Sequence, residues 1–262
     1  MDGTSASRLG TFERLFLLVP IAGGVVFGVL PYLALEPVSR ALGYTGDDPY
    51  VYRIAGAATF GYAVALTLGL ARGEWPPLRH VVLATYVFNS VSFLAALAEL
   101  GTGRLTLVAG LILVTALFIS WSTARILVGR RGTVAGGRDV ASWTIWITAL
   151  AIVGALFFGL VAQVAPAFAS AVGYRGSDEI VYRLGGAATL GYAAMGVSEL
   201  RGPRWEELRL PTIMGIVFNG LAFLASLVEL ASGRLTLPVV AIGPASLVFT
   251  VAFAIVLMRR GR

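Results

Sequence analysis

Residues 41–62 read ALGYTGDDPYVYRIAGAATFGY and residues 171–192 read AVGYRGSDEIVYRLGGAATLGY, so a shift of 130 positions superposes the two stretches without a gap. The same shift places VFNSVSFLAALAELGTGRLTL, residues 87–107, over VFNGLAFLASLVELASGRLTL, residues 217–237. Similarity at one constant offset is the signature of an internal duplication. The chain is therefore predicted to contain two copies of one unit.

The boundaries of the two copies follow from the stretch between them. Residues 129–142, GRRGTVAGGRDVAS, are rich in glycine and arginine, which is typical of a linker. We assign residues 1–130 to the first copy, residues 131–143 to a cytoplasmic linker and residues 144–262 to the second copy.

The apolar residues of the chain are gathered into long runs. Hydrophobic residues make up 57% of the sequence and charged residues only 13%, and the runs have the length of about twenty residues that crosses a bilayer as a helix. Eight runs occur, at 15–35, 54–71, 81–98, 105–128, 144–164, 184–198, 211–228 and 235–258. The fold class predicted is an all-α polytopic membrane protein of eight transmembrane helices. Because each copy has an even number of spans, the copies form two parallel four-helix repeats with pseudo-two-fold symmetry about the membrane normal.

The composition excludes several classes of cofactor chemistry. The chain has no cysteine, no lysine and a single histidine, His80. Thiolate metal sites and disulfides need cysteine, a retinal Schiff base needs lysine, and a membrane haem with two histidine ligands needs a second histidine. We therefore expect no cofactor and no metal.

Arginine distribution predicts the orientation of the chain. Fourteen of the 20 basic residues fall at the chain ends and in the even-numbered loops between the runs. Cytoplasmic loops are enriched in arginine, so both termini are predicted to be cytoplasmic in a multi-pass protein of the cell membrane. Because the arginines are spread over short loops rather than clustered on one soluble face, nucleic acid is not expected as a partner.

Each copy places the same charged side chains at the opposite, outer surface. They are Asp48, Arg53, Glu99 and Arg104 in the first copy, and Asp178, Arg183, Glu229 and Arg234 in the second. Charge close to the hydrocarbon region is costly unless it is paired. We predict ion pairs within each copy, Arg53 with Glu99 and Arg183 with Glu229, that hold the outer loop to the bundle. The alternative is an outward-facing site for an anion or a lipid headgroup.

Four polar side chains lie within the apolar runs. Asn89 and Asn219 are near the middle of the third run of their copies, and Tyr62 and Tyr192 lie within the second. An amide that faces lipid would be left without hydrogen-bond partners, so both amides should point inward. These four residues are the candidate solute-binding set. Interhelical hydrogen bonds and aromatic packing are the simpler explanations for them.

Small residues at a spacing of four predict close helix contacts. Gly24 and Gly28 have this spacing in the first run. Such pairs let two helix backbones approach each other in a membrane.

Each copy resembles the DoxX-like group of small four-helix bacterial membrane proteins. The likeness rests on a proline ahead of LGY (42–44) or VGY (172–174), on YRIAGAATFGY (52–62) or YRLGGAATLGY (182–192), and on the turns GTGRL (101–105) or ASGRL (231–235). The resemblance implies a four-helix unit in each copy. Some members of that group look like accessory subunits of membrane redox complexes, but no cofactor-binding residue carries over to this chain.

The sequence leaves three classes of function open. We expect a cofactor-free, non-enzymatic membrane protein that binds or transports a small or lipophilic solute between its two copies. The first alternative is an accessory or scaffold subunit, whose partners would be other membrane subunits or a second copy of the chain in addition to membrane lipids. The second is a lipid-modifying enzyme that uses Glu99 or Glu229.

Overall fold

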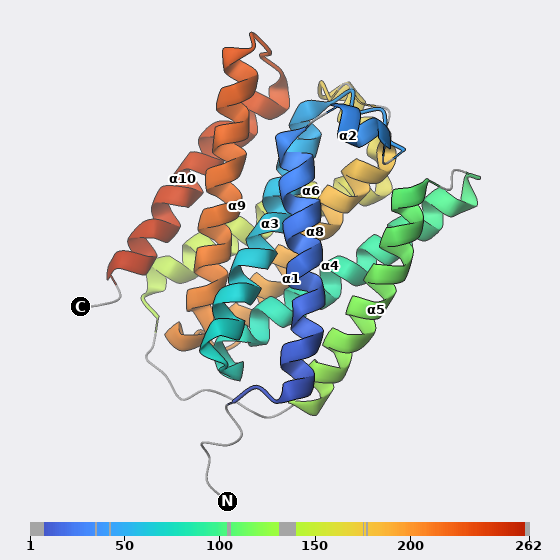
Figure 1. Ribbon diagram of the computed structural model, residues 1–262. Helices are drawn as coiled ribbons and strands as arrows, with labels where there is room; N and C mark the ends of the chain where they lie inside the picture. The colour runs from blue at the N-terminus through green and yellow to red at the C-terminus, as the bar shows by residue number, and fades with distance from the viewer. Residues whose placement is uncertain are drawn as a thin grey trace, which may run out of the picture.

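The computed structural model describes residues 8–34, 36–41, 43–103, 106–130, 140–174, 176 and 178–259, and it is all-α in this part of the chain (Figure 1). The helices are α1 (Thr11–Leu33), α2 (Glu36–Ala41), α3 (Pro49–Arg72), α4 (Trp75–Gly101), α5 (Leu107–Gly129), α6 (Ser142–Val164), α7 (Pro166–Ala171), α8 (Glu179–Leu200), α9 (Trp205–Ala231) and α10 (Leu237–Arg259). Both ends of the chain lie toward the end of the bundle opposite α2 (Figure 1). We call these ends the α2 end and the terminal end.

Seven of the described helices are long and apolar enough to cross a membrane: α1, α3, α4, α5, α6, α9 and α10. Large apolar side chains face outward from them, such as Val114, Trp146 and Val164, which are 68%, 75% and 78% exposed. Lipid is the solvent that accepts such a surface. The structure fits a multi-pass membrane protein.

Helix boundaries follow the offset found in the sequence. Adding 130 to the bounds of α4 gives those of α9, and the same addition converts α2 into α7 and α5 into α10. The start of α8 is likewise 130 residues after that of α3, although α8 ends two residues earlier by this measure. Like residues in the two copies therefore produce like helices.

The two copies are interlocked rather than side by side. The long helix α3 packs mainly on α1 and on α9 of the second copy, and α8 packs mainly on α6 and on α4 of the first copy. Contacts between α3 and α4, or between α8 and α9, are far fewer. The helices that follow each other in sequence are thus separated, and the shared core lies among α3, α4, α8 and α9.

Glycines set the closest of these contacts. A side-chain carbon at Gly28 would collide with the backbone of Phe60, and one at Gly24 would press against Ala63. The predicted close approach of the first helix is confirmed, and its partner is α3.

The terminal end is fastened by charge. Glu13 at the start of α1 accepts hydrogen bonds from Arg130, with Nε at 2.6 Å from Oε1 and the terminal nitrogen at 2.5 Å from Oε2. The same guanidinium donates to the carbonyl of Arg8. This contact ties the start of α1 to the end of α5.

Candidate functional site

A cavity of about 480 Å³ lies in the second copy, among α6, α7, α8, α9 and α10, with a few residues of α3 at its edge. Along α8 its wall runs from Val181 to Glu199. At a rise of 1.5 Å per residue, that stretch is about 27 Å long, close to the thickness of a bilayer's hydrocarbon core. We call this cavity the α6–α10 groove.

The wall of the groove is almost entirely apolar, and its polar groups are mostly engaged. Thr189 donates to the carbonyl of Gly186 at 2.9 Å, and Thr212 donates to the carbonyl of Leu208 at 2.8 Å. Hydroxyls that are satisfied within their own helix offer little to a polar ligand. The groove therefore favours a lipophilic occupant.

Glu199 is the exception in this wall. Its side chain lies in the last turn of α8 and is 4% exposed, and its Oε1 has no hydrogen-bond partner among the described residues. Of the residues that line the groove it is the one carboxylate, and none of the others is arginine or histidine. In the first copy, 130 residues earlier, stands Gly69, against which Leu78 and Leu210 pack.

Tyr62 and Tyr192 lie at the centre of the molecule. The hydroxyl of Tyr62 donates to the carbonyl of Ala188 at 2.7 Å, and that of Tyr192 donates to the carbonyl of Ala58 at 3.1 Å. Their rings meet edge to face at 5.1 Å. The pair joins α3 to α8 across the two copies, and Tyr192 also lines the groove.

Each of these hydroxyls rests against a glycine of the opposite helix. A side-chain carbon at Gly61 would overlap the hydroxyl of Tyr192, and one at Gly191 would overlap that of Tyr62. Only glycine leaves room for the crossed hydrogen bonds.

Asn89 and Asn219 both bond within their own helices. The amide nitrogen of Asn89 donates to the carbonyl of Thr85, and that of Asn219 to the carbonyl of Gly215, each at 2.8 Å. Asn89 is buried, whereas Asn219 is half-buried and lines the groove. The structure thus brings Asn219 and Tyr192 to one cavity and leaves Asn89 and Tyr62 out of its wall.

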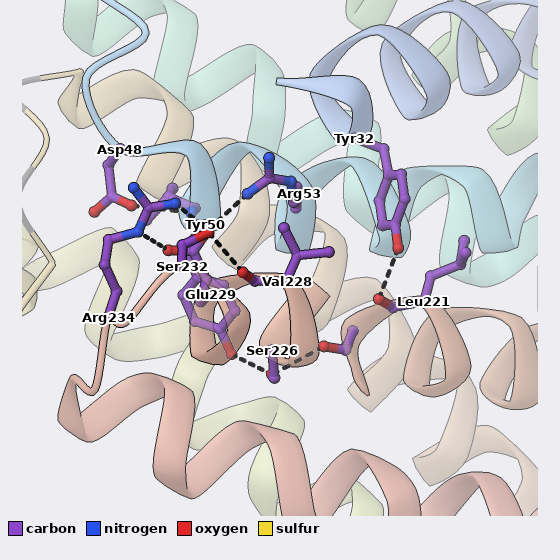
Figure 2. Close-up of polar contacts among 12 residues, drawn as sticks. Tyr32, Asp48, Tyr50, Arg53, Leu221, Ser226, Val228, Glu229, Ser232 and Arg234 are labelled. Atoms are coloured by element: carbon purple, nitrogen blue, oxygen red, sulfur yellow. Dashed lines mark hydrogen bonds and ion pairs between the residues drawn. The ribbon is translucent and has the colours of Figure 1, made fainter. Parts of the chain in front are cut away.

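At the α2 end, Glu229 is held between two arginines (Figure 2). Arg53 of α3 approaches its Oε1 at 2.6 Å, and Nε of Arg234 lies 2.5 Å from its Oε2. The Glu229 side chain is only 3% exposed, so both charges are needed to offset its burial. Below this pair, Tyr50 donates to Ser226 at 2.9 Å, since the Ser226 hydroxyl itself donates to the carbonyl of Ala222.

The pairing predicted within each copy is wrong. Arg53 pairs with Glu229 of the other copy and not with Glu99, and the ion pair that Arg183 forms in the described chain is with Glu179 at 3.8 Å rather than with Glu229. The reason is the interlocked packing, which places the start of α3 against the end of α9. Arg104 lies outside the described residues, and Glu99 is half-buried.

The two outer-loop aspartates also bind across the copies. Asp178 accepts hydrogen bonds from the backbone of Thr45 and Gly46, at 3.1 and 3.2 Å, and from the hydroxyl of Tyr52 at 2.5 Å. Asp48 caps α3 by accepting from the Val51 backbone at 3.3 Å. These contacts fasten each outer loop to the other copy.

Tyr44 stands within this outer layer. Its hydroxyl is buried, and no described residue bonds to it. Burial raises its pKa, and the nearby carboxylates of Asp178 and Glu99 raise it further. The phenol is neutral at physiological pH.

A second polar group, at the terminal end, went unnoticed in the sequence. His80 of α4 is 2% exposed, with Nε2 2.9 Å from a carboxylate oxygen of Glu207 and Nδ1 3.0 Å from the hydroxyl of Ser198. Because a carboxylate only accepts, Nε2 carries the proton, and Ser198 donates to Nδ1 when the ring is neutral. The contacts join α4, α8 and α9.

The described residues contain no cluster of three metal-ligating side chains. The chain matches no protein-family model, none of the curated proteins and no solved structure. The resemblance to DoxX-like modules therefore stays a prediction, and function must be argued from the groove.

Proposed function

We propose that the protein is an eight-span membrane protein of two parallel four-helix copies that binds a lipophilic solute in the α6–α10 groove. The observation that carries the proposal is the groove itself, an apolar cavity of about 480 Å³ within a membrane bundle. Ligand pockets have volumes of about 300–1,000 Å³ and mostly apolar walls. A solute that enters such a groove exchanges lipid contacts for protein contacts of similar polarity.

In this proposal α8 is the eighth span. It has 22 residues and stands 130 positions after α3, which meets the criteria for a span. A helix of that length reaches about 33 Å, enough for a bilayer core. Its polar ends, with Glu179 at one and Ser198 and Glu199 at the other, lower its mean hydropathy, and its place between α4 and α6 shields it from lipid.

Arginine counts place both termini in the cytoplasm, and with them the terminal end of the bundle. The α2 end, with Glu229 and its arginines, then faces outward. Reporter fusions at each terminus and at residue 176 test the topology. Termini on opposite sides of the membrane would exclude an even number of spans.

The two alternatives have less support from the described residues. Glu229 is occupied by two arginines, which leaves it poorly suited to act as the general acid or base of a lipid-modifying enzyme. An accessory subunit would cover the groove with a partner helix. A second copy of the chain is the partner that the test below detects.

Filling the groove is the direct test of solute binding. Ala241 lines the groove on α10, and its counterpart on α5 is Leu111, which is exposed on the surface of the bundle. Ala241→Phe should lower the occupancy of a lipophilic probe such as hexadecanol, measured by native mass spectrometry of the detergent-solubilised protein. Leu111→Phe should leave the occupancy unchanged.

Two results would contradict the proposal. Equal occupancy in wild type and both variants would place the probe elsewhere on the apolar surface. Conversion of a dimer into a monomer by Ala241→Phe, without any bound probe, would show that the groove is an interface between two copies.

A further inference from the structure

The chemistry of the groove is set by its end near the chain termini. There Glu199 brings a carboxyl group into an apolar wall, 4% exposed and with one oxygen unbonded. No described residue lies within ion-pair distance of it. Its neighbour Arg201 is exposed and lies beyond the end of α8.

An ionised carboxylate in such a place costs several kcal/mol unless a donor or a cation meets it. A structural carboxyl would be expected to find a partner in the protein, as Glu229 and Glu207 do. Glu199 has a neighbouring cavity instead. A buried polar group that is left unpaired beside a cavity indicates that its partner comes from outside the chain.

The field around Glu199 selects the sign of that partner. The residue lies in the last turn of α8, where the free carbonyl groups carry a partial negative charge. A carboxylate and a helix C-terminus together favour a cation and repel an anion. No described side chain in the groove wall carries a compensating positive charge.

Resting on the proposed function, we propose that the solute is a single-chain lipophilic amine, with its ammonium group on Glu199 and its alkyl chain along α8 toward the α2 end. The wall beyond Glu199 passes Gly196, Tyr192, Gly185 and Val181 in turn. Over this length of about 27 Å it offers no second charge. A narrow apolar groove with one acid at its end matches an alkyl chain with one basic headgroup.

The experiment compares three probes of equal chain length: hexadecylamine, hexadecanol and hexadecanoic acid. Occupancy is measured by native mass spectrometry of the full chain in a nonionic detergent at neutral pH. We expect the amine to bind about tenfold more tightly than the alcohol, as a charge-assisted hydrogen bond allows, and the acid to bind most weakly. Glu199→Gln should bring the amine to the level of the alcohol and leave the alcohol unchanged.

The matched control is Glu179→Gln, at the exposed opposite end of α8. It should keep the preference for the amine. If amine, alcohol and acid bind the wild type equally and Ala241→Phe abolishes all three, the groove binds lipophiles but Glu199 does not select an amine, and this inference is overturned alone. If none of the three probes binds, the proposed function falls with it. The comparison of probes on the wild type needs no variant, so poor folding of Glu199→Gln leaves the test intact.

Discussion

The outer helices of the two copies meet in different ways. In the first copy, Phe16 of α1 stacks on Phe118 of α5 at 5.4 Å and meets Trp121 at 6.0 Å. The residues 130 positions after Phe118 and Trp121 are Val248 and Val251 of α10. No aromatic contact among the described residues joins α10 to α6. Loss of two rings accompanies the groove in the second copy.

A second difference lies at the inner end of the same region. Gly69 in the first copy is packed under leucine side chains, whereas its counterpart Glu199 stands at a cavity. Duplication thus kept one copy closed and let the other acquire a charged group and a space. Positions that differ between matched copies indicate where function was added to a common scaffold.

The largest expected effect concerns the matched glutamates at the α2 end. Glu229→Gln strands Arg53, whose side chain is 17% exposed, without its counter-ion. Breaking a buried ion pair by removing one partner costs about 3–5 kcal/mol. We expect a matching loss in the free energy of unfolding, measured by denaturant titration in mixed micelles.

Glu99→Gln is the counterpart of that change in the first copy. Glu99 is half-buried and forms no ion pair with any described residue. Its replacement should cost less than about 1 kcal/mol. Similar losses for both variants would mean that the two outer clusters are energetically equivalent, against the asymmetry seen here.

The next effect is a closure of the groove by the residues of the first copy. Val248→Phe with Val251→Trp restores on α10 the two rings of α5, and Trp146 of α6 occupies the position of Phe16. Bridging α6 to α10 in this way should lower hexadecanol occupancy about tenfold, which corresponds to about 1.4 kcal/mol. The reciprocal pair, Phe118→Val with Trp121→Val, should leave occupancy unchanged. A closed variant that binds as the wild type does would show that these rings are not what separates the copies.

Much of the helix arrangement was predictable because lipid and duplication both leave periodic marks. Seven of the eight apolar runs coincide with helices that meet the criteria for a membrane span. The pairing of Arg53 was not predictable. Neither charge nor hydropathy shows that α3 packs on α9 of the other copy, because that contact depends on how whole helices interlock.

The residues that sequence reasoning missed did carry a signal, namely their departure from the repeat. At the shift of 130, Glu199 faces Gly69, His80 faces Leu210, and Glu207 faces Pro77. A buried acid or base that replaces an apolar counterpart needs a reason. The cavity beside Glu199 and the bond from His80 to Glu207 provide one in each case.

The crossed tyrosines should show a smaller effect. Tyr62→Phe and Tyr192→Phe each remove one hydrogen bond between α3 and α8, which is worth about 0.5–1.5 kcal/mol. We expect similar losses of stability, because the two bonds are alike. Only Tyr192→Phe should also alter hexadecanol occupancy, because only Tyr192 lines the groove. An equal change in occupancy for Tyr62→Phe would point to a site at the centre of the bundle.

The smallest effect is expected at the matched amides. Asn89 and Asn219 each donate to a carbonyl four residues earlier in their own helix, and that carbonyl also accepts the regular helical bond. Replacement by leucine therefore strands no backbone group and should cost at most about 0.6 kcal/mol, the average for a membrane side-chain hydrogen bond. Asn89→Leu serves as the control because its side chain is buried away from the groove. Asn219→Leu should make the groove wall more apolar and tighten hexadecanol binding slightly, as competition between the alcohol and hexadecylamine would detect. If Asn219→Leu weakens the binding of both probes while Asn89→Leu does not, the Asn219 amide is a direct contact of the solute, and the headgroup must lie near the middle of α9 rather than at Glu199.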